Sequence, residues 1–160
     1  MIIFEKAVDG VSHSALQRFA RRAQKLARVK GEVAVLITSR SSVQSLNRRF
    51  RRKDKPTDVL SFPRQHGGDI AICAEMARQN AARLGHSVSD EIKVLVLHGM
   101  LHLAGHDHET DSGEMERAEA RLRSRLRLPA SLIQRNQPGH VTAGDSRRTT
   151  TLGGRRGKKR

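Results

Sequence analysis

Several residue types are scarce in this chain of 160 residues, and each scarcity narrows what the protein can be. A single cysteine, Cys73, excludes an internal disulfide framework and fits a reducing compartment. No apolar run approaches the ~18 residues that suggest a membrane-spanning helix. The first ten residues lack the charged and long apolar regions of a secretory signal. We therefore expect a cytoplasmic protein that has no membrane partner.

Aromatic and acidic residues are also in short supply. The chain has four Phe and neither Trp nor Tyr, which disfavours proteins that read single-stranded bases by stacking them on exposed rings. It has 16 acidic residues against 31 Lys and Arg, which gives a formal net charge of +15. Such an excess favours a polyanionic partner, most commonly nucleic acid, held through its phosphates. The alternative is a charge that serves solubility alone.

The positive charge is spread over two segments of different composition. Residues 136–160 hold seven basic residues and one acidic residue, whereas residues 1–135 hold 24 basic and 15 acidic residues. The first of these segments has almost no apolar content, so we predict a disordered basic tail over 136–160. Residues 1–135 have the length of a single domain, which can fold without a disulfide or metal staple.

Hydrophobic periodicity predicts short strands mixed with helices. We expect strands at 1–4, 32–38, 59–62 and 69–74. We expect helices over 12–28 (capped by Ser12 and closed by Gly31), from Ser41 or Ser42 to 50, over 75–84, from Ser89 or Asp90 to 104, and over 112–128. This order predicts an α+β fold in which a small mixed sheet packs against helices. Residues 92–104 are apolar almost all round, so this helix should be buried at the centre.

The most informative pattern is H-x3-H-x5-H, formed by His98, His102 and His108. Residues four apart share one face of a helix, so the first two histidines can bind one metal ion. A left-handed Gly105 would end the helix and fold the chain back, which would bring His108 to the same ion. A single histidine would more often be a hydrogen-bonded core residue, but three at this spacing predict a metal site. Three protein ligands leave a position open, as in catalytic zinc sites, so we expect one Zn²⁺ per chain, with nickel or copper as alternatives.

The same spacing matches the metzincin peptidase pattern H-E-x-x-H-x-x-G-x-x-H with one exception. Gly99 stands where that pattern has its glutamate general base. A peptidase of this type needs the carboxylate to deprotonate metal-bound water, so a metallopeptidase is disfavoured. Asp107 is either a hydrogen-bonding partner of a ligand or an exposed turn residue.

A second pattern is the dense group of cations between residues 48 and 55, whose segment 51–56 we expect to form a loop. Such a group can hold a phosphodiester, and arginine suits bidentate phosphate contacts. Each charge taken singly could equally be a solvated loop residue. The predicted nucleic-acid-binding residues are Arg48, Arg49, Arg52, Lys53 and Lys55. Thr57 and Asp58, which follow, are expected to fix a turn.

Together with the histidines, the segments LNRRFRRKDKPTDVLSFP (46–63) and GDI (68–70) resemble the YbeY family of bacterial endoribonucleases, which act in ribosomal RNA maturation. The resemblance spans about residues 33–108. It implies an α+β fold around the histidine helix and a zinc-type ion on the three histidines. It also implies catalytic roles for Arg51, in a positively charged cleft beside the metal, and for Asp69. A hydrogen-bonding role at the start of a strand is the alternative for Asp69.

These observations lead us to expect a metal-dependent endoribonuclease that acts in ribosomal RNA maturation and ribosome quality control. We expect a monomer whose partners are ribosomal RNA, ribosomal subunits or ribosome-associated factors. The metal would polarise the scissile phosphate or activate a bound water, and Arg51 would stabilise charge on the phosphoryl oxygens. No carboxylate stands out as the general base. The alternative is a non-catalytic ribosome-assembly factor that binds ribosomal RNA and uses its metal only structurally.

Overall fold

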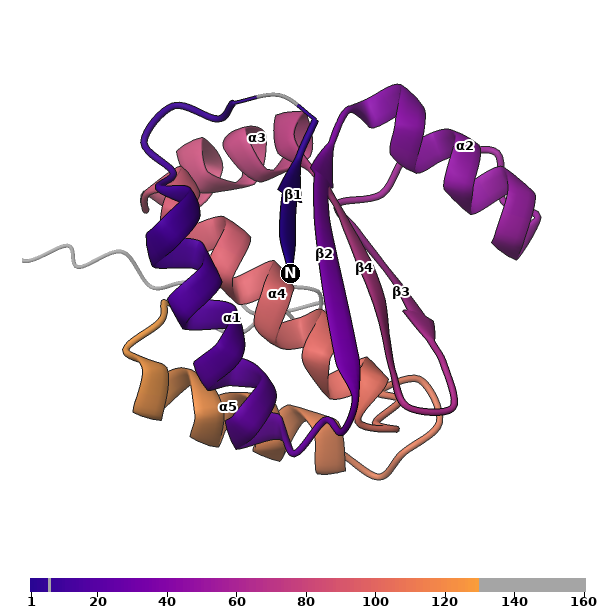
Figure 1. Cartoon of the computed structure of the whole chain (residues 1–160), viewed down its shortest axis with the longest axis vertical. Coiled ribbons are helices and arrows are strands. Elements are labelled where there is room, and N and C mark those ends of the chain that lie inside the picture. Colours follow the sequence, from indigo (N-terminus) through magenta and orange to yellow (C-terminus); the bar gives the residue numbers. More distant parts are fainter. Residues whose placement is uncertain (6, 130–160) are drawn as a thin grey trace, which may run out of the picture.

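The computed structural model describes residues 1–5 and 7–129, where four strands and five helices follow one another along the chain (Figure 1). The predicted tail, 136–160, lies outside the described residues. The elements, in chain order, are β1 (Ile2–Phe4), α1 (His13–Ala27), β2 (Glu32–Thr38), α2 (Arg40–Arg51), β3 (Val59–Pro63), β4 (Gly67–Cys73), α3 (Ala74–Leu84), α4 (Val88–Leu103) and α5 (Glu114–Leu126).

The strands form one mixed sheet in the order β1-β2-β4-β3. β1 with β2 and β2 with β4 are parallel pairs, whereas β3 with β4 is an antiparallel pair. The parallel pairs require crossover connections, and α1 supplies the one between β1 and β2. The predicted α+β fold with a small mixed sheet is therefore confirmed.

The main core lies between one face of the sheet and four helices, α1, α3, α4 and α5, which stand to the left of the strands in Figure 1. α4 is the central element, because it packs against the other three helices and against β3 and β4. Its residues are buried in an unbroken run from Val94 to Leu101, as the apolar sequence predicted. At Gly99 an added Cβ would lie only 2.8 Å from the Ile70 side chain, so a larger residue would prevent this close packing of α4 on β4.

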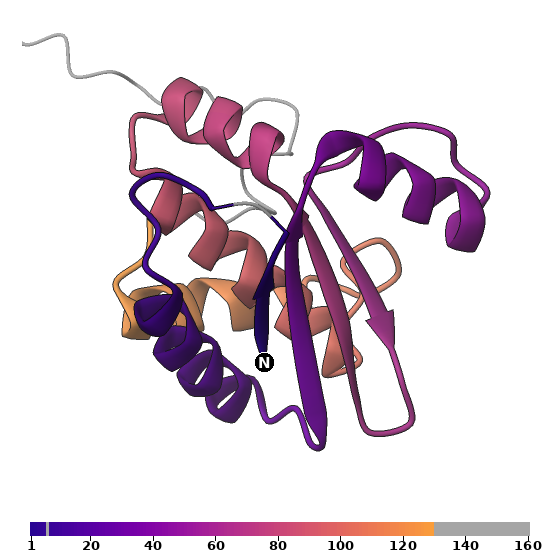
Figure 2. The same ribbon diagram turned by 45° about the horizontal axis from the view of Figure 1, so that its top comes forward.

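The opposite face of the sheet carries only α2 among the described helices (Figure 2). A second, smaller cluster of buried residues lies between α2 and the β3–β4 hairpin: Val43, Leu60, Ala71 and Cys73. Cys73 is a buried free thiol within this cluster. Because α2 is packed through this cluster, its C-terminal residue Arg51 is held at the edge strand β3.

Two helices begin earlier than predicted. α2 starts after Ser39, whose hydroxyl accepts a hydrogen bond from the Ser42 amide at 3.2 Å. α4 starts after Ser87, whose hydroxyl accepts from the Asp90 amide at 3.0 Å. Both predicted start points were wrong because each segment contains several residues that can cap a helix, and the sequence alone does not choose among them.

The ends of α1 and α2 also differ from the prediction. α1 ends at Ala27 with Arg28 in the left-handed region (φ 60°), before Gly31 is reached. α2 continues through Arg51, and Arg52 takes the left-handed position with φ 56°. Of the loop predicted over 51–56, only Arg51 is therefore helical, and it projects from the same helix as Arg48 and Arg49.

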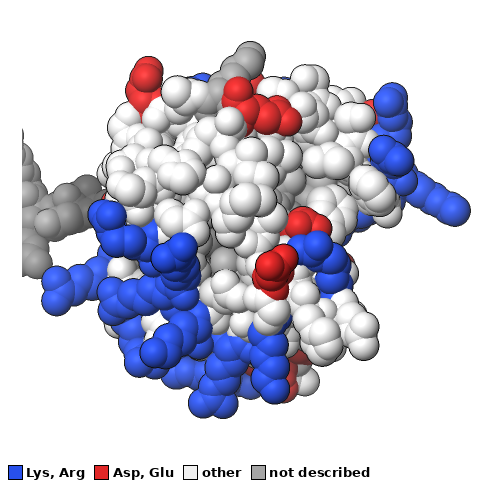
Figure 3. Space-filling view, in the orientation of Figure 1, with Lys and Arg blue, Asp and Glu red and all other residues white. Residues whose placement is uncertain are grey.

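Positive charge gathers on one part of the surface, over α1 and α5 at the lower left of Figure 3. Arg22 on α1 donates a hydrogen bond to the backbone oxygen of Arg125 on α5, so the two helices present their charges side by side. The exposed cations of this α1–α5 basic face are Arg18, Arg21, Arg22, Lys25, Arg117, Arg121 and Arg125. Within the described residues, no helix has both the length and the apolar character needed to cross a membrane.

Candidate functional site

The C-terminus of α4 brings the three predicted metal ligands together. His98 and His102 lie one turn apart on the helix, and their Nε2 atoms are 3.1 Å apart. Gly105 follows with φ 94°, and its amide donates to the His102 oxygen while the His106 amide donates to the Leu101 oxygen. This pair of hydrogen bonds is a Schellman motif, which ends the helix and turns the chain back.

The turn places His108 beside the two helical histidines. Its ring centroid is 5.4 Å from that of His98 and 5.4 Å from that of His102. One ligand nitrogen from each ring lies within 4.8 Å of the others. The expected backbone reversal at Gly105 is therefore confirmed, and it assembles a cluster of three imidazoles.

The chemistry of this donor set fits a divalent transition metal. Burial, together with the neighbouring His98 and His108 rings, lowers the pKa of His102 from 6.5 to about 4. That ring is neutral at physiological pH, and neutral imidazole is the form that binds metal ions. Two nitrogen ligands at ~2.0–2.1 Å from a tetrahedral zinc ion are about 3.3 Å apart, close to the 3.1 Å between the Nε2 atoms of His98 and His102.

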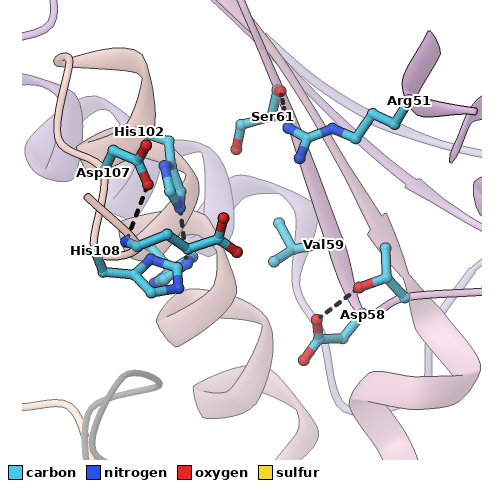
Figure 4. Close-up of a pocket in the computed structure, with 10 residues that line it drawn as sticks. Arg51, Asp58, Val59, Ser61, His102, Asp107 and His108 are labelled. Atoms are coloured by element: carbon cyan, nitrogen blue, oxygen red, sulfur yellow. Dashed lines mark hydrogen bonds between the residues drawn. The ribbon is translucent and has the colours of Figure 1, made fainter. Parts of the chain in front are cut away.

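The histidines form one wall of a pocket of about 360 Å³ (Figure 4). Arg51 lies on the opposite wall, with Ser61 of the edge strand β3. Its guanidinium donates a hydrogen bond to the Ser61 backbone oxygen at 2.9 Å. A guanidinium has five N–H donors, so this bond fixes the side chain and leaves donors for a phosphate. The residues that line the pocket are Arg51, Thr57, Asp58, Val59, Ser61, His98, His102, Asp107, His108 and Glu109.

The other predicted cations surround α2 without lining this pocket. Arg48 and Arg49 are exposed on the helix, and the Arg49 guanidinium lies 5.2 Å from the centre of the Phe50 ring. Arg52, Lys53 and Lys55 are exposed in the segment that follows. The side chain of Asn47 donates a hydrogen bond to the Lys55 backbone oxygen at 2.8 Å and so ties this segment to α2.

Asp69 lies apart from the histidines. Its neighbour Ile70 packs against Gly99 of α4, so the Asp69 side chain projects toward the other face of the sheet. There its carboxylate forms an ion pair with Arg64 at 3.2 Å. The structure thus brings Arg51 to the histidine cluster but does not bring Asp69 there.

Three carboxylates in the pocket were not singled out from the sequence as proton acceptors: Asp58, Asp107 and Glu109. Asp58 accepts a hydrogen bond from the Asn80 side chain at 3.3 Å, and its backbone oxygen accepts one from the Cys73 amide, so it ties the start of β3 to α3 and to the end of β4. Asp107 accepts from the Glu109 amide, which lowers its pKa and shapes the turn that carries His108. In the sequence, the only sign of the pocket wall that carries Asp58 is the Thr57–Asp58 pair. The wall itself forms from segments that are distant in sequence and meet only in the fold.

Comparison with known proteins agrees with this site. The family model described as Endoribonuclease YbeY matches residues 3–127. The chain belongs to the YbeY family. The resemblance seen over residues 33–108 is therefore confirmed and extends over nearly all described residues.

Individual YbeY relatives cover most of the chain. Endoribonuclease YbeY of Koribacter versatilis is 56% identical over 138 residues, which cover 84% of this chain and 91% of the relative. That of Solibacter usitatus is 46% identical over 138 residues, with 85% and 94% covered. The solution structure of TM1509 from Thermotoga maritima superposes with a TM-score of 0.56 at 29% identity, over 79% of this chain and 89% of that one.

Proposed function

We propose that this protein is a metal-dependent endoribonuclease that cleaves ribosomal RNA during maturation and ribosome quality control. The observation that carries the proposal is that Arg51 and the three histidines line the same pocket. A metal ion on the three histidines, opposite a fixed guanidinium, would suit a phosphodiester, because its negative charge would then have a cation on each side. The endoribonuclease names of the relatives point to the same reaction class.

In this proposal His98, His102 and His108 hold one divalent ion, with Zn²⁺ as the expected metal because three imidazoles suit it. The ion, when bound, supplies a Lewis acid for the phosphoryl oxygens or lowers the pKa of a water ligand. Arg51 binds the non-bridging oxygens of the scissile phosphate and stabilises the charge that develops there. The Ser61 carbonyl holds the Arg51 side chain in place through the hydrogen bond at 2.9 Å.

Proton transfer falls to the carboxylates of the pocket wall. Asp58 lies on the same wall as Arg51 and Ser61, across the pocket from the histidines (Figure 4). A carboxylate in this position can accept a proton through one intervening water. Asp107 is engaged by two hydrogen bonds in its turn, so we assign it the task of fixing the His108 segment.

The surface charge supports RNA as the substrate. The cations of α2 and the segment after it, Arg48, Arg49, Arg52, Lys53 and Lys55, extend the phosphate-binding surface beyond the pocket. The α1–α5 basic face supplies further exposed cations for the backbone of a large RNA. We infer that the protein acts as a monomer in the cytoplasm, with ribosomal subunits or ribosome-associated factors as its partners.

Peptide hydrolysis receives no support from the site. Gly99 occupies the position of a metzincin glutamate, and Ile70 fills the space into which any side chain there would extend. The pocket carboxylates come from the loop after α4 and from the segment before β3 instead. The cation Arg51 opposite the histidines favours an anionic phosphodiester over a neutral peptide bond.

The proposal is tested with purified protein, loaded with Zn²⁺ or stripped with a chelator, and incubated with ribosomal RNA. We expect cleavage only by the metal-loaded protein. The variant with His98, His102 and His108 all changed to Ala should neither hold the metal nor cleave. Tight RNA binding without cleavage at any metal load would instead favour the ribosome-assembly factor, and cleavage of peptide substrates run in parallel would contradict the nuclease assignment.

A further inference from the structure

A buried carboxylate from α5 lies behind the first metal ligand. Glu119 is 1% exposed, and its Oε2 is 3.6 Å from Nδ1 of His98. The other nitrogen of the same ring, Nε2, is 3.1 Å from Nε2 of His102. The His98 ring is therefore placed between the metal cluster and Glu119, with one nitrogen toward each.

The position of Glu119 is set by the packing of α5. Met115, Ala118 and Leu122 on the same helix are buried in the main core, so α5 is held firmly against α4. The start of α5 is tied to the turn after the metal ligands, because Asp111 accepts hydrogen bonds from the Gly113 and Met115 amides. The carboxylate thus sits on a rigid element and faces a ring that is itself buried.

A carboxylate at this place determines which nitrogen of His98 carries the proton. Neutral imidazole has one N–H and one lone pair, and the hydrogen bond made at one nitrogen decides which is which. Within the described part of the chain, His98 Nδ1 has no hydrogen-bond partner, and Oε2 of Glu119 lies 3.6 Å away, just beyond hydrogen-bonding distance. A small movement of either side chain would let Nδ1–H donate to the carboxylate, which directs the Nε2 lone pair to the metal.

We propose that Glu119 is a positioning residue that fixes the orientation and the Nδ1–H tautomer of His98 and thereby raises the affinity of the site for its metal. This inference rests on the proposed metal function of the three histidines. Carboxylates that orient a histidine ligand in this way are worth about 10–100-fold in metal affinity.

The chain offers a matched control. Glu91, on the first turn of α4, is 0% exposed and lies 2.5 Å from Nε2 of His86. It is also a buried glutamate paired with a histidine, but it lies seven residues before His98, about 10 Å along the helix. Glu91→Gln therefore perturbs a similar buried pair outside the metal cluster.

The experiment measures Zn²⁺ affinity by competition with a chromophoric chelator for the wild type, Glu119→Gln and Glu91→Gln. We expect Glu119→Gln to bind Zn²⁺ at least tenfold more weakly, and Glu91→Gln to stay within about twofold of the wild type. Nitrogen NMR of the metal-free protein provides the second readout. His98 should show a protonated Nδ1 in the wild type and in Glu91→Gln, and a mixture of tautomers in Glu119→Gln.

Each alternative outcome has a distinct meaning. Equal losses of Zn²⁺ affinity in Glu119→Gln and Glu91→Gln would show that Glu119 acts only through the stability of the fold, which would overturn the inference. An unchanged affinity or an unchanged His98 tautomer in Glu119→Gln would also overturn it, while leaving the nuclease proposal intact. A wild-type protein that binds no Zn²⁺ or other divalent transition metal would refute the proposed function, and this inference with it.

Discussion

Replacing Gly99 with alanine gives a stability change whose sign depends on one neighbour. The new Cβ would lie 2.8, 2.9 and 3.0 Å from the Cδ1, Cγ2 and Cγ1 atoms of Ile70, which is itself 1% exposed. Two of these atoms are bonded to the Cβ of a β-branched side chain, so rotating the side chain does not clear all three. Overpacking of this kind costs about 1–3 kcal/mol, whereas alanine gains about 1 kcal/mol over glycine in a helix interior.

The net effect of Gly99→Ala on the wild-type background should therefore be a loss of up to about 2 kcal/mol in the free energy of unfolding. Ile70→Ala removes all three obstructing atoms. In that background the same Gly99→Ala change should stabilise the protein, by up to about 1 kcal/mol, since the helix preference of alanine is then unopposed.

The assay is urea unfolding of the four metal-free proteins at one pH, with the denaturant slope checked for constancy. A double-mutant cycle isolates the interaction between the two positions. Gly99→Ala effects of the same sign in both backgrounds would refute the reasoning, because the Ile70 side chain would then not be the reason for glycine at this position.

Four further predictions concern the site and the surface. Arg51→Ala should lower the single-turnover cleavage rate by a factor of about 10²–10³. Arg49→Ala, on the same helix but outside the pocket, should mainly weaken RNA binding. Equal effects of the two changes would show that the cations at 48–55 only bind phosphate and that Arg51 has no separate role in cleavage. Arg51→Lys should restore binding better than rate, since it lacks the planar fork. The metal-free protein should lose stability as the pH falls from 6.5 toward about 4, since unfolding frees His102 to take up a proton; His102→Asn should reduce this dependence, and an unchanged dependence would contradict it. Changing Arg18, Arg21 and Lys25 together to Gln should lower the magnitude of the slope of log affinity for duplex RNA against log salt concentration by about 3. The same change at Arg40, Arg78 and Arg83, on α2 and α3, should leave that slope unchanged.

The sequence was most informative where the structure depends on nearby residues. The strand at 32–38, the cap at Ser12 and the left-handed Gly105 all follow from local periodicity or backbone preference, and the structure has each of them. The histidine cluster belongs to the same class, because one helical turn and one chain reversal are enough to bring its members together.

The rest of the site depends on segments that are distant in sequence. Arg51 approaches the histidines because α2 packs on one face of the β3–β4 hairpin and α4 on the other, which no spacing in the chain reveals. Glu119 is one of several acidic residues in a charged helix, and only the packing of α5 shows that it is buried. The catalytic role expected for Asp69 rested on the resemblance of the segment around it to the family. Side chains alternate along β4, however, so Asp69 points to the face of the sheet opposite to Ile70, which contacts α4.

The three histidines differ in how firmly the protein holds them, and this difference bears on how the proposed metal ion would be exchanged. His98 is buried, His102 is partly buried, and His108 is exposed on a segment without regular structure. Segments of this kind open at a low free-energy cost, whereas a central helix opens only when much of the domain unfolds. Dissociation is therefore expected to begin at His108 while the two helical ligands still hold the ion. Ribosomal RNA bound over that segment would slow this first step, so an enzyme engaged with its substrate would lose metal to a chelator more slowly than a free one.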